Sequence, residues 1–256
     1  MQLDLVDISH RYADVAALAD INLTIEDGEV VALIGPSGCG KSTLLSIVGG
    51  LLQPSCGKVF QQGQTPPGCL NPLTYIFQDF ALLPWRTVAG NIRLVLGDHG
   101  LSKPEQDDRV AEVLARTGLH EFRKAFPRQL SGGMRQRVGI ARALAVEPAV
   151  LLMDEPLSSL DAQTREILME EFAGLFLKTG ITAVYVTHNL EEAVRLAHRV
   201  VALSRRPGRV KEVVEIPVPI QNRVDSDPDL RRCRNRLWQL IREEAIAADQ
   251  ELSHER

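Results

Sequence analysis

The stretch VVALIGPSGCGKSTLLSIV, residues 30–48, decides the fold of this chain. An apolar run meets a glycine-rich loop, and a segment of helical composition follows it. The loop matches the pattern G-x-x-x-x-G-K-[ST] at Gly35, Gly40, Lys41 and Ser42. Its glycines allow backbone N–H groups to turn inward around phosphate oxygens, and the following helix presents its positive end. A strand, a phosphate loop and a helix in this order predict a nucleotide-binding α/β core.

The chemistry of the loop assigns a role to two of its side chains. Lys41 is expected to reach the β- and γ-phosphates, and the Ser42 hydroxyl is expected to bind Mg²⁺. The alternative is a glycine-rich turn with a solvated lysine, which the position between a strand and a helix disfavours. The predicted nucleotide-binding residues of the loop are Gly35, Pro36, Ser37, Gly38, Cys39, Gly40, Lys41, Ser42 and Thr43.

Composition narrows the class of protein. Of the 256 residues, 45% are hydrophobic and 24% are charged, as in an ordinary globular protein. The formal net charge is −4, so the chain lacks the excess of positive charge typical of nucleic-acid-binding proteins, and we expect no nucleic-acid partner. Apolar runs such as VVALI fall far short of the roughly 18 residues that a membrane span needs. The four cysteines form no CxxC pair, which favours free thiols in a reducing compartment. These features predict a soluble cytosolic protein.

Strand and helix signals alternate along the chain on both sides of a helical middle section. Strands are predicted in LDLVDISH, in INLTIEDGEVVALIG with Asp27-Gly28 as a hairpin-type turn, and in KVFQQG, LTYIFQ, AVLLMDE, TAVYVTH and RVVALS. This alternation predicts a parallel α/β sheet that a helical insertion interrupts. We expect residues 1–83 to hold a β subdomain and the phosphate loop, and 84–146 to form the helical subdomain. Residues 147–215 then complete the core, and 216–256 form a helical tail.

Two acidic residues and one histidine follow predicted core strands. Asp154 and Glu155 end the apolar run AVLLM, where open α/β sheets place ligand chemistry. Asp154 is expected to hold Mg²⁺, and Glu155 to polarise the attacking water as a general base. The alternative is that one of them caps the next helix. His188 follows TAVYVT, where an imidazole can hydrogen-bond a γ-phosphate and position the water. A lone histidine is more often structural, but the position after a third core strand, in a chain with a phosphate loop, favours a catalytic His188.

A second turn of the phosphate-binding kind lies at Ser131-Gly132-Gly133, in LSGGMRQR. It opens a predicted helix, so its N–H groups and the helix dipole also suit an anion. An N-cap serine followed by flexible glycines is the alternative interpretation. One phosphate loop is enough to hold one nucleotide, so the second turn needs an explanation.

Over residues 1–215 the chain closely resembles the ATPase subunits of ABC transporters. The landmarks of that family occur in order: GPSGCGKST, Gln78 in IFQD, LSGGMRQR, LLMDEP, Ser159-Leu160-Asp161 and His188 in VTHN. The resemblance implies a P-loop NTPase (RecA-like) core with an antiparallel β subdomain and an inserted α-helical subdomain. It also implies that Tyr12 stacks on adenine and that Gln78 contacts Mg²⁺ and the water. Asp161 would lie at the interface between two subunits.

The resemblance explains the second turn. In the family, two ATPase subunits pack head to tail, with each ATP between one phosphate loop and the LSGG turn of the other subunit. We therefore expect a homodimer with Ser131, Gly132 and Gly133 as ATP ligands, docked on transmembrane permease subunits at the cytosolic face of the inner membrane. A periplasmic substrate-binding protein would be an indirect partner. The segment DFALLPWRTVAGNI, residues 79–92, would form the groove for a permease helix, although Phe80, Leu82, Leu83 and Trp85 could instead be core.

Several segments look like the branch that imports nitrate, taurine and aliphatic sulfonates. The segments are QDFALLPWRTVAGNI, SLDAQTR and SRRPGRV, whereas PLSSLD stands where that branch usually has PFSALD. Uptake of a small anionic solute is therefore the leading hypothesis, and a different small solute would fit the same motifs. Two competing functions are an ABC-type ATPase of DNA repair or translation, and a nucleotide-binding regulator without turnover. The arginines of the tail, Arg231, Arg232, Arg234 and Arg236, predict either a contact to anionic lipid or a solvated helix face.

Overall fold

The computed structural model describes residues 1–78, 81–158, 160–224 and 226–254. The chain forms two compact units. The first unit consists of Met1–Gln64 together with Glu166–Arg256, and the second consists of Thr65–Arg165. The four-part division that we expected from the sequence remains a prediction.

A three-stranded antiparallel sheet forms one layer of the first unit. Its strands are β1 (Gln2–Tyr12), β2 (Val15–Ile25) and β4 (Cys56–Gln62), in the order β2-β1-β4. Along β1, residues such as Leu3 and Leu5 are buried and alternate with more exposed neighbours, as period-two patterning requires. This sheet is the antiparallel β subdomain that the sequence resemblance implied.

A second sheet carries the core of the first unit. It contains β3 (Val30–Ile34), β7 (Thr182–Val186), β8 (Arg199–Leu203) and β9 (Val210–Glu215), in the order β7-β3-β8-β9. The first three strands are parallel, and β9 pairs with β8 in the antiparallel direction. Every residue of β3 and β7 is buried, which explains their continuous apolar sequence.

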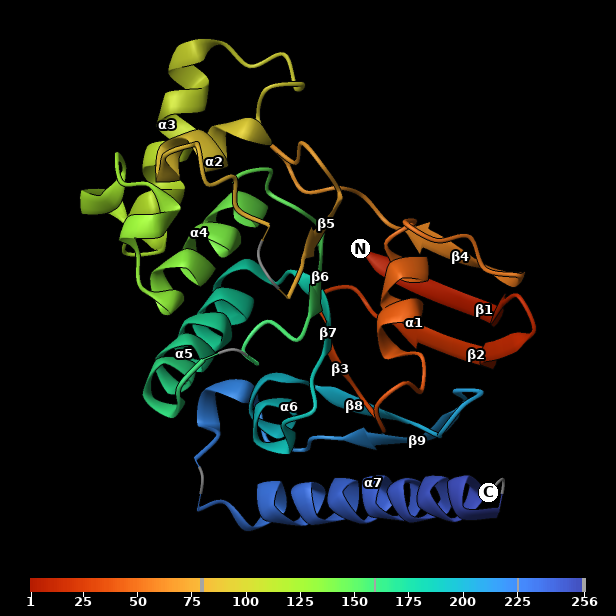
Figure 1. Cartoon of the computed structure of the whole chain (residues 1–256). Helices are drawn as coiled ribbons and strands as arrows, with labels where there is room; N and C mark the ends of the chain where they lie inside the picture. Colours follow the sequence, from red (N-terminus) through yellow and green to blue (C-terminus); the bar gives the residue numbers. More distant parts are fainter. Residues whose placement is uncertain (79–80, 159, 225, 255–256) are drawn as a thin grey trace. The chain divides into compact units, whose positions relative to one another are not determined.

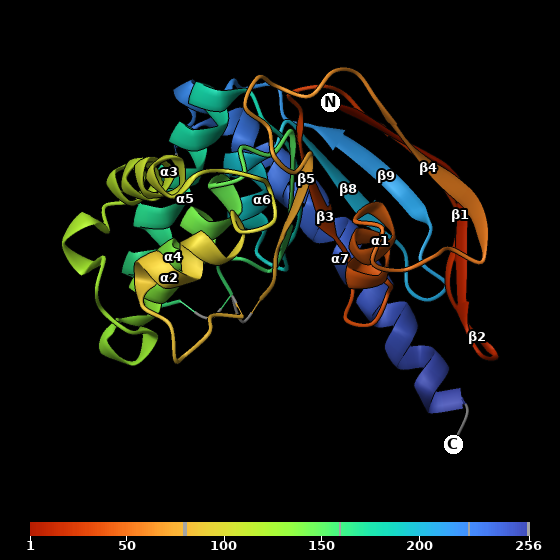
Figure 2. The same ribbon diagram turned by 90° about the horizontal axis from the view of Figure 1, so that it is seen from above.

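Helices cover both faces of this sheet. The helix α1 (Lys41–Val48) lies between the two sheets and contacts both β7 and β2 (Figure 1). The helix α6 (Leu190–Leu196) packs on β3 and on α7 (Pro228–His254), and α7 runs along β8 and β9 (Figures 1 and 2). The long helix α5 (Ala162–Thr179) begins at the boundary of the two units, and a short 3₁₀ turn, Ile220–Asn222, precedes α7.

One local prediction is wrong. Asp27-Gly28 does form a turn, with Gly28 at a φ of 75° and the Glu29 amide donating to the Glu26 carbonyl. However, β2 pairs with β1 and β3 pairs with β7 and β8, so the turn carries the chain from one sheet to the other. The hairpin is instead formed by β1 and β2 around Ala13, whose φ of 48° fits a tight turn.

The second unit contains the helical insertion. Three helices pack against one another: α2 (Val88–Leu94), α3 (Lys103–Arg116) and α4 (Gly132–Leu144). Two short 3₁₀ turns, His120–Phe122 and Pro127–Gln129, connect α3 to α4. The unit also holds a parallel pair of strands, β5 (Leu73–Ile76) and β6 (Val150–Asp154). The predicted fold class, an α/β core with an antiparallel β subdomain and an inserted helical part, is confirmed.

The arginines of α7 are largely matched by acidic residues. Arg232 pairs with Asp229 on the same helix, Arg234 pairs with Glu191, and Arg236 forms a bidentate pair with Glu212. This arrangement favours the solvated helix face over the lipid contact. Within the described residues, we find no helix with both the length and the apolar character that crossing a bilayer requires.

Candidate functional site

The phosphate loop lies at the carboxyl end of β3, where it passes into α1. Gly38 and Gly40 have φ values of 75° and 103°, in the left-handed region that glycine adopts without strain. A Cβ atom on Gly40 would lie 2.6 Å from Leu18 Cδ2, so the neighbouring strand also requires glycine there. The pattern of glycines in the sequence therefore follows from backbone conformation and close packing together.

The side chain of Lys41 already lies over the loop. Its ammonium group donates to the carbonyls of Gly35 at 2.8 Å and Pro36 at 2.9 Å, and the residue is buried. These carbonyls keep the ammonium group at the loop. Ser42 is exposed at the next position, on the first turn of α1.

Tyr12 lies at the end of β1, close to the same helix. Its ring is 51% exposed and packs edge-on against His10, with ring centroids 4.6 Å apart. Its hydroxyl lies 3.4 Å from Thr43 Oγ1, within hydrogen-bonding distance. The structure thus places an exposed aromatic ring beside the phosphate loop, as stacking on a base would require.

His188 follows β7, the strand that pairs with β3. Its side chain is exposed, whereas the residues around it are firmly held. The Thr187 hydroxyl donates to the Glu192 carboxylate at 2.6 Å, and Asn189 caps α6 by accepting from the Glu191 and Glu192 amides. Because β3 and β7 are parallel and adjacent, His188 and the phosphate loop share the carboxyl edge of one sheet.

Cys39 is enclosed inside the loop. The residue is 1% exposed, and burial raises the pKa of its thiol even though the charge of Lys41 acts in the opposite direction. A neutral, buried thiol is a poor nucleophile. Cys39 therefore fills space beneath the loop.

In the second unit, Asp154 ends β6 beside the neighbouring strand. Its Oδ2 atom lies 3.4 Å from the Tyr75 hydroxyl of β5, which donates to it. The strand behind it, from Val150 to Met153, is fully buried. The carboxylate therefore emerges at the end of an apolar strand, as the sequence predicted.

Glu155 has an unusual backbone conformation. Its φ is 47°, a left-handed value that costs a non-glycine residue about 1–2 kcal/mol. Ser158 holds this conformation, because its amide and its hydroxyl both donate to the Glu155 carbonyl, at 3.2 and 3.0 Å. The Gln78 side chain in turn donates to the Ser158 hydroxyl at 3.4 Å. The structure thus joins Gln78 to the turn that carries Glu155.

The Ser131 turn begins α4 as a helix cap. The Ser131 hydroxyl accepts from the Met134 amide at 3.2 Å, and Ser131 and Gly132 are exposed at the start of the helix. Gly133 is half-buried and packs closely against Thr164, since a Cβ atom there would lie 2.6 Å from Thr164 Cγ2. The cap and the anion-binding interpretations are compatible, because Ser131 Oγ satisfies only the Met134 amide.

One contact ties α4, the helix that this turn begins, to the segment after Glu155, and a second contact is local to that segment. The buried Gln136 side chain on α4 donates to the Pro156 carbonyl. Asp161 accepts from the Thr164 amide at 3.0 Å and from its hydroxyl at 2.7 Å, which lowers the pKa of its carboxyl. Asp161 therefore caps the start of α5, and its predicted place at a subunit interface remains a prediction.

The site residues that the sequence singles out fall in both units, and their roles remain predictions. Tyr12, the phosphate loop and His188 belong to the first unit, whereas Gln78, Asp154, Glu155, the Ser131 turn and Asp161 belong to the second. Ser158 and Gln136 were not singled out, although both hold the turn after Glu155. Their positions inside PLSSLD and LSGGMRQR were the only available signal. Ser159 and Phe80 lie outside the described residues.

The donor atoms of the site fit Mg²⁺ with phosphate as co-ligand. Among the described residues, no three histidine, cysteine or acidic side chains gather to hold a metal ion by themselves. Magnesium commonly uses one or two carboxylates together with substrate phosphates and water. A half-buried Asp154 carboxylate and hydroxyl or amide oxygens from Ser42 and Gln78 are donors of this kind. The predicted magnesium ligands are therefore chemically suitable.

The fold and these residues define a nucleotide-hydrolysing P-loop protein. The sequence pattern of the ABC transporter family matches residues 18–158. An ABC transporter ATP-binding protein of Methanocaldococcus jannaschii is 42% identical, with 91% of this chain and 86% of that protein covered. The nitrate import ATP-binding protein NrtD of Synechocystis is 42% identical (86% and 84% covered), and the taurine import ATP-binding protein TauB of Shigella boydii is 44% identical (81% and 83%).

Solved structures of ABC transporter cassettes are also similar to this chain. The dimeric structure of a bacterial ABC transporter cassette has a TM-score of 0.74 and 33% identity, covering 85% of this chain and all of that one. A dimeric post-hydrolysis state of that cassette with ADP and phosphate has a TM-score of 0.73 and 32% identity, with the same coverage. This chain therefore belongs to the ABC transporter family. It is an ATP-binding, ABC-type ATPase.

Proposed function

We propose that this ATPase energises the import of a small anionic solute, of the nitrate, sulfonate or taurine kind, through a separate membrane permease. The observation that carries the proposal is the identity of more than 40% to nitrate and taurine import ATPases. The left-handed backbone of Glu155, the proposed general base, supports it. The protein would work at the cytoplasmic face of the membrane. A periplasmic binding protein would deliver the solute to the permease.

For hydrolysis, each residue has a proposed task. Lys41 and the loop amides bind the β- and γ-phosphates, and Tyr12 stacks on the adenine. Glu155 accepts a proton from the attacking water, while Gln78 and His188 orient that water and the γ-phosphate. Ser42, Gln78 and Asp154 would hold Mg²⁺, which neutralises charge on the phosphates when bound.

The Ser131 turn serves the nucleotide of a second copy. In a two-fold dimer, the surface around the phosphate loop of each chain meets the Ser131 turn of the other, so both contacts form twice. ATP then stabilises the closed pair, and loss of the bridging γ-phosphate after hydrolysis releases it. Gly132 is exposed at the start of α4, where a phosphate of the second copy could approach. This arrangement gives each of the two anion-binding turns a function.

The permease is proposed to dock on the loop that precedes α2. Trp85 in this loop is 71% exposed, so it is not core of the helical insertion. The fully buried Asn91 holds the loop from below, accepting from the Leu83 amide and donating to the carbonyls of Leu83, Arg86 and Thr87. A loop built so firmly around an exposed tryptophan favours the docking interpretation.

The second unit also offers exposed aromatic side chains outside this loop. A pocket of about 390 Å³ in the same unit is lined by Tyr75, Phe77 and Leu94, among others. Phe77 stacks on Tyr75 and is itself 43% exposed. A helix of the permease would gain affinity by burying these rings together with Trp85.

Copurification tests the proposed partner. We expect tagged wild-type protein from detergent-solubilised membranes to bring down a multi-span permease, and Trp85→Ala to reduce its yield at least about tenfold, as the loss of an aromatic anchor predicts. The control is Trp238→Ala, which removes another exposed tryptophan (59% exposed) from α7. Recovery of the wild type without a permease, or with ribosomal or DNA-repair proteins, would overturn the transport assignment.

A further inference from the structure

We propose that Arg206 and Glu244 are positioning residues for ATP binding, which hold the phosphate loop in its binding conformation through the β8–β9 loop, residues 204–209. This inference depends on nucleotide binding by a single chain and is independent of the permease and the solute. All of its contacts lie within the first unit.

The β8–β9 loop packs directly against the phosphate loop. A Cβ atom on Gly208 would lie 2.1 Å from the Cys39 carbonyl oxygen, and one on Gly35 would lie 2.9 Å from the Leu203 carbonyl oxygen. Gly208 also exchanges two backbone hydrogen bonds with β2, donating to Ala17 at 2.9 Å and accepting from Ala19 at 3.0 Å. The two loops therefore cannot move independently without loss of these contacts.

Arg206 holds one peptide group of the phosphate loop. Its Nε and Nη2 atoms donate to the Gly38 carbonyl at 3.3 and 3.2 Å. The N–H of the same peptide group, from Cys39, donates to the Pro36 carbonyl at 3.3 Å. A loop whose N–H groups must turn toward phosphate has to direct carbonyls elsewhere, and Arg206 provides a charged donor for one of them.

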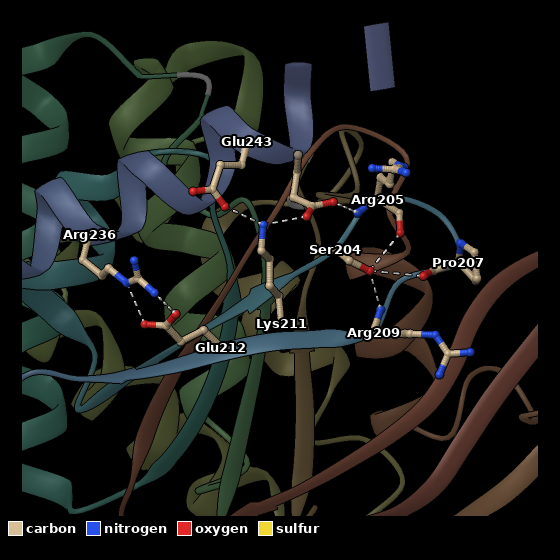
Figure 3. Close-up of polar contacts among 9 residues, drawn as sticks. Ser204, Arg205, Pro207, Arg209, Lys211, Glu212, Arg236 and Glu243 are labelled. Carbon is tan, nitrogen blue, oxygen red and sulfur yellow. Dashed lines mark hydrogen bonds and ion pairs between the residues drawn. The ribbon is translucent and has the colours of Figure 1, made fainter. Parts of the chain in front are cut away.

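The β8–β9 loop is itself organised around Ser204. The Ser204 hydroxyl accepts from the Arg209 amide at 3.0 Å, and its proton lies within reach of the carbonyls of Arg205, at 3.0 Å, and Pro207, at 3.3 Å (Figure 3). The Ser204 amide donates to the Arg209 carbonyl at 2.9 Å. These bonds fix the direction in which Arg206 leaves the loop.

Helix α7 secures the base of this loop through Glu244. The buried Glu244 carboxylate accepts from the amide of Arg205, at the start of the loop, at 2.7 Å and from the ammonium of Lys211, on β9, at 2.7 Å. Glu243 adds a second carboxylate at 3.0 Å from Lys211, as Figure 3 shows. Burial alone would raise the pKa of Glu244, but the bonds from Lys211 and the Arg205 amide together hold it below its usual range. Glu244 is therefore charged at neutral pH and holds the loop and β9 together through these two contacts.

These contacts fix the phosphate loop before ATP binds, so ATP binding loses less conformational entropy. Without these contacts the loop would sample other conformations, and binding would select only the competent fraction. Loss of these contacts would therefore lower nucleotide affinity. The hydrolysis step, for which Glu155 is the proposed general base, would not change. The structure therefore predicts an effect on KM and on Kd, with little effect on kcat.

The test compares single and double variants in ADP titration calorimetry and in steady-state ATPase assays. We expect Arg206→Ala to raise the Kd for ADP and the KM for ATP by about fivefold, the worth of one exposed charge-assisted hydrogen bond. Glu244→Ala should raise both in the same direction, and Arg206→Lys should recover part of the affinity. Since both residues act through one loop, the double variant should lose no more than the larger single effect.

The control is Arg236→Ala, which breaks the bidentate pair with Glu212. That pair joins the same helix to the same hairpin but makes no contact with the β8–β9 loop, so KM should stay at the wild-type value (Figure 3). Wild-type Kd and KM in Arg206→Ala would overturn the proposal. An equal loss in Arg236→Ala would also overturn it, since the effect would then come from general docking of α7.

Discussion

Replacing Glu155 by glutamine is expected to lower kcat for ATP hydrolysis at least about a hundredfold and to leave ATP affinity near the wild-type value. The glutamine side chain has the same size but cannot accept the proton of the attacking water. Ser158 holds the turn through the backbone carbonyl of residue 155, so the exchange leaves that support intact. Phosphate release under saturating ATP measures kcat, and calorimetry measures affinity.

The chain offers a matched control for this substitution. Glu147 also has a left-handed backbone, with a φ of 46°, and pairs with Arg109 at 3.2 Å in the same unit. Glu147→Gln therefore makes the same chemical change in the same backbone conformation, and its kcat should stay near the wild-type value. Near-normal turnover in Glu155→Gln, or an equal loss in Glu147→Gln, would remove Glu155 from the role of general base.

Gly132→Asp is expected to slow hydrolysis strongly by a different route. The first residue of α4 is exposed, and the nearest atom to an added Cβ is Arg135 Nη2 at 4.0 Å, so a side chain fits. Aspartate at a helix N-terminus even favours the helix. In the proposed dimer, however, its charge would face a phosphate of the other copy. We expect kcat/KM to fall about a hundredfold, equivalent to roughly 2.7 kcal/mol.

The comparison with Gly132→Asn separates charge from size. Asparagine has nearly the same volume and no charge, so its loss of kcat/KM should be much smaller. ADP affinity of the single chain should be unchanged in both variants, because the phosphate loop supplies it. Equal losses in the two variants would argue against an anion at this turn, and no loss in either would exclude the turn from the reaction.

The sequence predicts those features that depend only on neighbouring residues, and it predicts poorly those that depend on distant residues. The phosphate loop is a continuous pattern from Gly35 to Ser42, and the backbone conformation of the loop itself requires glycine, as at Gly38 and Gly40. Asp27-Gly28 is an equally local turn signal, but the partners of the strands on either side are chosen by the tertiary fold, so the predicted hairpin was wrong. A turn residue predicts a change of direction and leaves the next sheet undetermined.

Supporting residues were harder to predict than reacting ones. Glu155 and His188 follow apolar strands, and that position marks them in the sequence. No sequence pattern identifies Arg206 or Glu244, because their hydrogen-bond partners, Gly38 and Arg205, lie 168 and 39 residues away along the chain. Trp85 was undecided between core and surface, and only the buried amide of Asn91 explains why its loop holds it outward. Long-range contacts of this kind require coordinates.

Two copies of this chain are proposed to share each ATP between the phosphate loop of one and the Ser131 turn of the other. Light scattering during gel filtration of the Glu155→Gln protein, with saturating ATP and Mg²⁺, tests it most directly because bound ATP persists in this variant. We predict the mass of two chains with ATP and of one chain with ADP, and the mass of one chain with ATP when Gly132→Asp is added. A single-chain mass for Glu155→Gln with ATP bound would contradict the account.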